Sequence, residues 1–267
     1  MDTHITDEQV ATYQRDGCLI LKDFFAQEEA DELIGAVDES VAQMGRQKVA
    51  GEGNKELLEG ESYYDRIFLQ RLNLWKINDT IKKYFLNPAL GEMLCDLAGI
   101  DGLRIWHDQT LQKQPWANPT AWHLDNPYWS FHSHNALSIW IALDDATLQN
   151  GCLYYLPGTH KTATYENVDI REDMASLFNV YPQWKNIEPV AAEMKKGWAG
   201  IHNGLTAHGA GPNMTPRPRR AMTCAYMPDG ERFNGQQNIL PKAYFESLQV
   251  GDLLNNDEHN PLVWWRK

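Results

Sequence analysis

Two residues in the middle of the chain could bind a metal ion together. His123 and Asp125 stand two positions apart in the stretch WHLD. If this stretch is extended, both side chains point to the same side of the backbone and converge on one point. An imidazole and a carboxylate are two of the three ligands in the 2-His-1-carboxylate triad, which binds Fe(II) in non-haem oxygenases and leaves coordination positions open. A second histidine must then come from elsewhere in the chain.

His208, in the segment TAHGAGPN, is the candidate for that second histidine. The glycines that follow it leave room around a metal ion. His202 is an alternative ligand, but no glycine-rich segment follows it. We therefore expect His202 to be structural or to face the substrate.

Arg219 follows His208 at the start of a predicted strand. A guanidinium group there can form a two-pronged ion pair with a carboxylate. 2-Oxoglutarate needs such a partner, because its keto acid end chelates iron and its far carboxylate needs a cation. Strand alternation puts Arg219 and Ala221 on one side and Arg220 on the other, and the small Ala221 leaves space beside Arg219 for a slender dicarboxylate.

The order of these motifs resembles the phytanoyl-CoA dioxygenase family. The chain carries WHLD, then NGCLYYLPGTHK, then HGAGPN followed by PRRA. The resemblance covers most of the chain and implies a double-stranded β-helix, a cupin-like jelly roll whose mouth holds Fe(II). It implies that the metal ligands are His123, Asp125 and His208.

The resemblance also implies how the cosubstrate is bound. Arg219 matches the arginine that binds the far carboxylate of 2-oxoglutarate. Trp140 matches a family position beside the cosubstrate, and Gln109 falls at a position, variable in the family, that lines the same pocket.

The implied reaction uses Fe(II), 2-oxoglutarate and O2 to hydroxylate, or otherwise oxidise, a C–H bond of a small molecule, with release of succinate and CO2. Related iron halogenases lack the carboxylate that Asp125 provides, so its presence favours hydroxylation. Two alternatives stay open. One is a jelly-roll binding module that has lost catalysis, against which the intact triad argues. The other is a cupin-type enzyme that uses another metal, such as zinc or manganese.

The predicted elements are helices first and strands afterwards. Capping and amphipathic patterns predict helices at 6–15, 26–44 and 88–98, and a glycine-rich, charged loop is expected at 45–60. Short runs rich in β-branched and aromatic residues predict the strands 103–112, 136–143, 152–156, 198–201 and 219–227. We therefore expect a mainly β fold with N-terminal helices.

We expect one domain over residues 1–267. Within it, residues 1–100 are the helical support, 101–230 the β core and 231–267 a C-terminal extension.

Composition limits the possible partners. The formal net charge of −12 disfavours binding to nucleic acid and to anionic membranes, and the single basic cluster, at 217–220, is too short for a nucleic-acid track. No apolar run reaches the roughly 18 residues of a membrane span, and no signal peptide is recognisable. The four cysteines form no CxxC pair. We therefore expect a cytoplasmic protein that acts on a small molecule and binds neither nucleic acid nor membrane.

The remaining histidines are weaker candidates. His132 and His134 also stand two positions apart, but no motif of the family surrounds them. We therefore expect them at the surface or at the rim of the pocket. For His160 a turn role and a substrate role stay open. His107 lies in a predicted strand and is expected to be packed. Trp129 and other tryptophans near WHLD fit either an aromatic substrate pocket or ordinary core packing.

Overall fold

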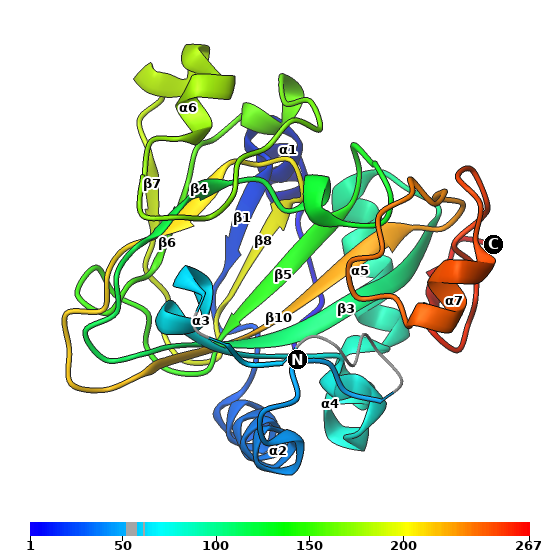
Figure 1. Ribbon diagram of the computed structural model, residues 1–267, viewed down its shortest axis with the longest axis horizontal. Coiled ribbons are helices and arrows are strands. Elements are labelled where there is room, and N and C mark those ends of the chain that lie inside the picture. Colours follow the sequence, from blue (N-terminus) through cyan, green and yellow to red (C-terminus); the bar gives the residue numbers. More distant parts are fainter. Residues whose placement is uncertain (52–57, 61) are drawn as a thin grey trace.

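The computed structural model describes residues 1–51, 58–60 and 62–267, and two antiparallel sheets form its centre (Figure 1). The large sheet has the strand order β1-β8-β5-β10-β3-β11, and β2 also pairs with β3. The small sheet has the order β4-β9-β6-β7. The loop expected at 45–60 falls partly outside the described residues, at 52–57.

The strands of the large sheet are β1 (Cys18–Leu21), β2 (Phe68–Leu72), β3 (Gly102–Lys113), β5 (Leu137–Ala142), β8 (Ala199–Asn203), β10 (Arg219–Pro228) and β11 (Leu262–Trp265). Those of the small sheet are β4 (Thr120–His123), β6 (Leu153–Tyr155), β7 (Val190–Ala192) and β9 (His208–Ala210). The five predicted strands correspond to β3, β5, β6, β8 and β10. The prediction of a mainly β jelly roll with N-terminal helices is confirmed.

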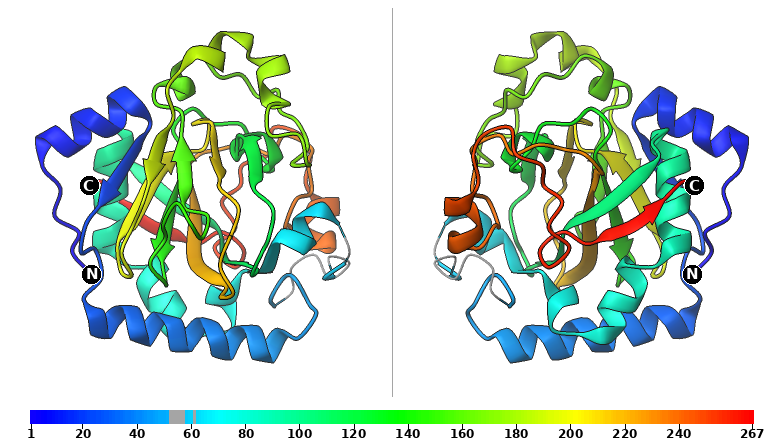
Figure 2. Two further views of the ribbon diagram at one scale, coloured as in Figure 1. Left: turned by 90° about the vertical axis from the view of Figure 1, so that its left-hand side faces the viewer. Right: turned by 90° about the vertical axis from the view of Figure 1, so that its right-hand side faces the viewer.

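The α-helices are α1 (Asp7–Asp16), α2 (Gln27–Met44), α3 (Tyr63–Ile67), α4 (Asp79–Phe85), α5 (Pro88–Ala98), α6 (Leu177–Val180) and α7 (Lys242–Ser247). Short 3-10 helices are η1 (Leu74–Lys76), η2 (Asn126–Tyr128), η3 (Thr159–Lys161) and η4 (Pro182–Asn186). Helices α1, α2, α4 and α5 lie outside the large sheet, and their apolar faces share one core with it (Figure 2). Among the described helices, none has the length and apolarity to cross a membrane.

Local signals explain where the predicted helices begin and end. The hydroxyl of Thr6 accepts a hydrogen bond from the backbone N–H of Gln9, and Oε1 of Gln9 accepts one from the backbone N–H of Thr6, which completes a capping box. The side chain of Asn87 caps α5, whose first residue is a proline. Gly17 and Gly99 end α1 and α5 in the left-handed conformation.

A one-residue bulge in β3 changes which of its side chains point into the interior between the sheets. Tyr226 of β10 pairs with Ile105, but the preceding Ala225 pairs with His107, so Trp106 is an extra residue on β3. This bulge reverses the alternation. Ile105 packs in the core shared with the helices, whereas His107 and Gln109 face the interior between the sheets.

Candidate metal and cosubstrate site

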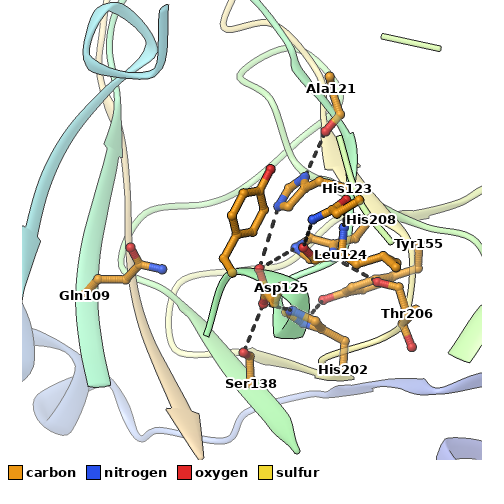
Figure 3. Close-up of polar contacts among 12 residues, drawn as sticks. Gln109, Ala121, His123, Leu124, Asp125, Ser138, Tyr155, His202, Thr206 and His208 are labelled. Carbon is orange, nitrogen blue, oxygen red and sulfur yellow. Dashed lines mark hydrogen bonds and ion pairs between the residues drawn. The ribbon is translucent and has the colours of Figure 1, made fainter. Parts of the chain in front are cut away.

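The predicted ligands His123, Asp125 and His208 converge between the two sheets (Figure 3). His123 ends β4 and stands directly opposite His208, the first residue of β9. Each of the three residues offers a ligand atom, and these atoms lie within 4.8 Å of one another. The Nε2 atoms of His123 and His208 are 3.7 and 3.6 Å from Asp125 Oδ1. The pairing of β4 with β9 therefore brings together residues 85 positions apart in the chain.

Backbone carbonyls orient both imidazoles. Nδ1 of His123 lies 2.8 Å from the carbonyl oxygen of Ala121, and Nδ1 of His208 lies 3.0 Å from that of Thr206. A carbonyl can only accept, so each Nδ1 carries the proton and donates. The lone pair of each Nε2 is thereby left for the shared point, as in histidines that bind metals.

The carboxylate of Asp125 is held through one of its two oxygens. Its Oδ2 accepts hydrogen bonds from the hydroxyl of Ser138 at 3.1 Å and from Nε2 of His202 at 3.2 Å. Nδ1 of His202 in turn lies 3.4 Å from the hydroxyl of Tyr155. These contacts leave Oδ1 facing the two imidazoles. His202 therefore contacts the proposed ligand Asp125 without being a proposed ligand itself. The sequence around His202 did not indicate this contact.

The charges of the three residues suit a divalent cation. Burial works against ionisation of Asp125, but His208, the hydrogen bond from His202 and His123 together keep its pKa well below the usual range. Burial lowers the pKa of His208 and of His123. One carboxylate and two neutral imidazoles result, which is the donor set of the Fe(II) triad.

Arg219 lines a small cavity whose lining also includes the three predicted ligands, and it has no anionic partner among the described residues. Its side chain is 1% exposed, and its guanidinium lies 5.0 Å from the ring of Trp140. Nη2 donates to the carbonyl of Gly151 at 3.0 Å, whereas Nε and Nη1 find no hydrogen-bond partner in residues 1–51, 58–60 and 62–267. Burial lowers its pKa to about 10, so the group is still cationic at neutral pH. A buried, unpaired cation is costly, so this cavity is suited to an anion.

A second basic residue, Lys113, lies beside Arg219 and was not predicted. The two residues stand opposite each other on β3 and β10. Lys113 is fully buried, and its Nζ donates to the hydroxyl of Thr120, which lines the same cavity, at 3.2 Å. Burial and the nearby guanidinium lower its pKa to about 6. Its place on the face of β3 that also carries Gln109 is the signal that could have identified it.

The other predicted site residues also lie here. Trp140 and Gln109 line the cavity of Arg219. Gln109 lines a larger cavity of about 390 Å³ as well, which shares His123 and Asp125. The structure thus brings together all six predicted site residues, although the roles of these residues remain predictions.

Arg220 points away from the site, as strand alternation predicts. Its guanidinium binds Asp144 at 2.8 Å and Asp38 at 3.1 Å on the other side of the sheet. Among the weaker histidine candidates, His132 is exposed and stacks on the ring of Tyr165, with the ring centroids 4.2 Å apart. His160 packs close to the turn at Gly17.

Comparison with known proteins decides the family. A sequence model described as phytanoyl-CoA dioxygenase matches residues 13–221. The chain belongs to the phytanoyl-CoA dioxygenase family. A relative of this family member is the probable alpha-ketoglutarate-dependent hypophosphite dioxygenase of Stutzerimonas stutzeri, which is 26% identical over 82% of this chain and 77% of that protein. Dioxygenase lolE1 of Epichloe uncinata is 31% identical over 58% of this chain and 56% of that protein.

Solved structures establish the fold of this phytanoyl-CoA dioxygenase family member. The alpha-ketoglutarate-dependent carbocyclase SnoK of nogalamycin biosynthesis superposes with a TM-score of 0.77, at 24% identity, over 97% of this chain and 96% of that one. EctD from S. alaskensis, solved with 2-oxoglutarate and 5-hydroxyectoine, gives a TM-score of 0.69 at 21% identity, over 93% and 85% of the two chains.

The family and the donor set together define the activity. This phytanoyl-CoA dioxygenase family member is an Fe(II)- and 2-oxoglutarate-dependent dioxygenase that uses O2. The three convergent donors fit Fe(II), and the guanidinium with two unpartnered nitrogen groups fits the cosubstrate.

Proposed function

We propose that His123, Asp125 and His208 hold the Fe(II) ion and that Arg219 binds the far carboxylate of 2-oxoglutarate. The observation that carries this proposal is the convergence of three oriented donors beside a buried, unpaired guanidinium. Bound Fe(II) and 2-oxoglutarate supply the activation of O2 for oxidation of a C–H bond, with release of succinate and CO2.

The protein's own residues fix the geometry of this reaction. The carbonyls of Ala121 and Thr206 orient the two imidazoles, while Ser138 and His202 hold Asp125. Trp140 packs against the guanidinium of Arg219 and keeps it in place. The hydroxyl of Thr120 adds a polar group to the cosubstrate cavity, and Lys113 holds this hydroxyl in place from behind by donating to it.

We further propose that the chain acts as one domain on a small-molecule substrate in the cytoplasm, without nucleic acid. The larger cavity of about 390 Å³ lies in the range of small-molecule sites, roughly 300–1,000 Å³. All four cysteines are free thiols, which is compatible with a reducing compartment. The strongly negative net charge opposes contact with polyanions.

The ligand assignment is tested by anaerobic titration with Fe(II) and by succinate release. The wild-type protein should bind one Fe(II) per chain, and His123→Ala, Asp125→Ala and His208→Ala should each abolish turnover. His4→Ala, at an exposed histidine, is the matched control and should behave as the wild type. Full turnover in His208→Ala together with none in His202→Ala would show that the wrong histidine has been assigned.

A further inference from the structure

The larger cavity beside the triad carries information about the substrate that the family alone does not give. It has a volume of about 390 Å³. Among its described lining residues are neither Arg219 nor Trp140, which line the smaller cavity. Because it shares His123 and Asp125 with the cosubstrate cavity, a molecule bound in it lies next to the metal site. Its other walls are therefore the surfaces that a substrate contacts.

His107 lines this cavity and has unused hydrogen-bonding capacity among the described residues. It is 5% exposed, and the bulge at Trp106 turns it toward the cavity. Its Nδ1 has almost no accessible surface and makes no well-formed hydrogen bond with the described residues, and its contact with the backbone of Asp108 falls short of one. A ligand in the cavity therefore meets the ring at its other nitrogen, Nε2, and a hydrogen bond there offsets part of the cost of burying a polar ring.

Gln109 offers a second polar group of fixed orientation. Its Oε1 accepts a hydrogen bond from Nε2 of Gln70 at 2.6 Å. This contact leaves the amide nitrogen of Gln109 directed toward the side of the cavity where Asp125 lies (Figure 3). Trp129 lines the cavity beside the ring of His107, with the centroids 6.4 Å apart, and provides an apolar wall.

The charge of the cavity excludes anions. Among the described residues that line it, none is lysine or arginine. Burial lowers the pKa of His107 to about 4, so its ring is neutral at pH 7. A carboxylate or a phosphate would lose its hydration here without gaining a counter-charge.

A cation is not favoured either. Of the two carboxylates in the lining, Asp125 belongs to the metal site, and Asp169 is exposed and paired with Arg171 at 2.6 Å. The cavity thus lacks, among its described walls, a buried carboxylate to hold an ammonium group. Neutral hydrogen-bonding groups and an aromatic wall remain.

We propose, on the basis of the function proposed above, that the substrate is an uncharged molecule with a hydrogen-bonding group placed against His107 and Gln109 and an apolar part against Trp129. Free carboxylic acids and CoA thioesters are then not substrates, because their charges find no partner in this cavity.

Three probes that share one acyl group test the charge preference. Phenylacetamide, phenylacetate and phenylacetyl-CoA are titrated into the anaerobic protein saturated with Fe(II) and 2-oxoglutarate, which keeps the cavity of Arg219 filled. The amide should bind at least tenfold more tightly than the acid and than the CoA thioester. Binding of the acid or of the thioester that equals or exceeds that of the amide overturns the proposal. Failure to bind Fe(II) and 2-oxoglutarate in the first step refutes the proposed function instead.

Two substitutions test the role of His107. His107→Phe keeps a flat ring but removes its hydrogen bonds, and it should weaken binding of phenylacetamide at least fivefold. His107→Gln restores a donor and an acceptor and should recover most of the loss. His4→Phe is the matched control. Equal affinity in His107→Phe and the wild type, with both proteins folded and Fe(II)-loaded, removes His107 from substrate recognition.

Discussion

Adjacent residues of one strand can have opposite roles, and Arg219 and Arg220 of β10 are such a pair. The side chain of Arg219 faces the interior and has no anionic partner in the described part of the chain, whereas Arg220 forms ion pairs with Asp144 and Asp38 on the other side of the sheet. The difference arises from strand alternation, which turns only Arg219 toward the proposed cosubstrate cavity.

Arg219→Ala should raise the KM for 2-oxoglutarate well over tenfold, because loss of a charged contact in a buried site costs on the order of 2–5 kcal/mol. Binding of Fe(II) should stay nearly intact. Arg220→Ala, the matched variant, should change the KM much less. The measurement is succinate production against the concentration of 2-oxoglutarate. Similar KM values for the two variants would contradict the assignment of Arg219 as anchor.

His202 should act through Asp125 as a positioning residue. His202→Phe removes the hydrogen bond to Oδ2 of Asp125 and should weaken Fe(II) binding about 10- to 100-fold, the usual effect of losing such a partner. His202→Gln, which keeps a donor, should recover part of the affinity. Anaerobic Fe(II) titration gives both values. Unchanged affinity in His202→Phe would mean that Ser138 alone positions the carboxylate.

Among the secondary-structure elements, hydrogen bonds connect the end of α1 to residues 203–208, the segment that ends at His208. The carbonyl of Gly17 accepts hydrogen bonds from the backbone N–H of Asn203 and from the hydroxyl of Thr206, each at 2.8 Å. Thr206 in turn orients His208 through its carbonyl. The N-terminal helix therefore supports the proposed metal site through the turn at Gly17, in addition to packing against the sheet.

Gly17→Ala should destabilise the protein more than Gly99→Ala does. Both glycines end a helix with positive φ, at 74° and 67°, so both substitutions incur backbone strain of about 1–3 kcal/mol. Of the two sites, only Gly17 is crowded, because a new Cβ there would clash with Nδ1 of His160 and with the hydroxyl of Thr206. Denaturant unfolding measures the two losses. Equal losses would show that the turn can relax without strain on the His208 segment.

At the scale of the whole molecule, the buried Lys113 links stability to pH. Its pKa is lowered to about 6 by burial and by Arg219, whereas an unfolded chain holds the proton up to about 10.4. Between these values the unfolded state binds more protons, so the free energy of unfolding gains up to about 1.4 kcal/mol per pH unit as the pH rises.

Lys113→Met should remove this dependence. The free energy of unfolding of the variant minus that of the wild type should be largest near pH 6, where the buried lysine destabilises the wild type most. This difference should decline steadily toward pH 10. Lys185→Met, at an exposed lysine, is the control and should follow the wild type. Urea unfolding at several pH values gives the slopes. Parallel curves for Lys113→Met and the wild type would show that Lys113 is not buried as a neutral amine.

Features that depend on neighbouring residues could be predicted from the amino-acid sequence. The capping box at Thr6, the cap at Asn87 and the H-x-D pair at His123 and Asp125 are all readable within a few positions. Strand alternation likewise separated Arg219 from Arg220. The order of motifs added the family, and with it the jelly roll and the Fe(II) and 2-oxoglutarate chemistry.

Features that depend on the pairing of strands distant in the chain could not be predicted in this way. Lys113 meets Arg219 because β3 pairs with β10, and His202 meets Asp125 because β8 lies beside β5 near the end of β4. Plain alternation would put His107 on the same face as Ile105, in the core under the helices. The one-residue bulge at Trp106 turns His107 into the cavity instead, and a bulge depends on the register with a partner strand more than a hundred residues away.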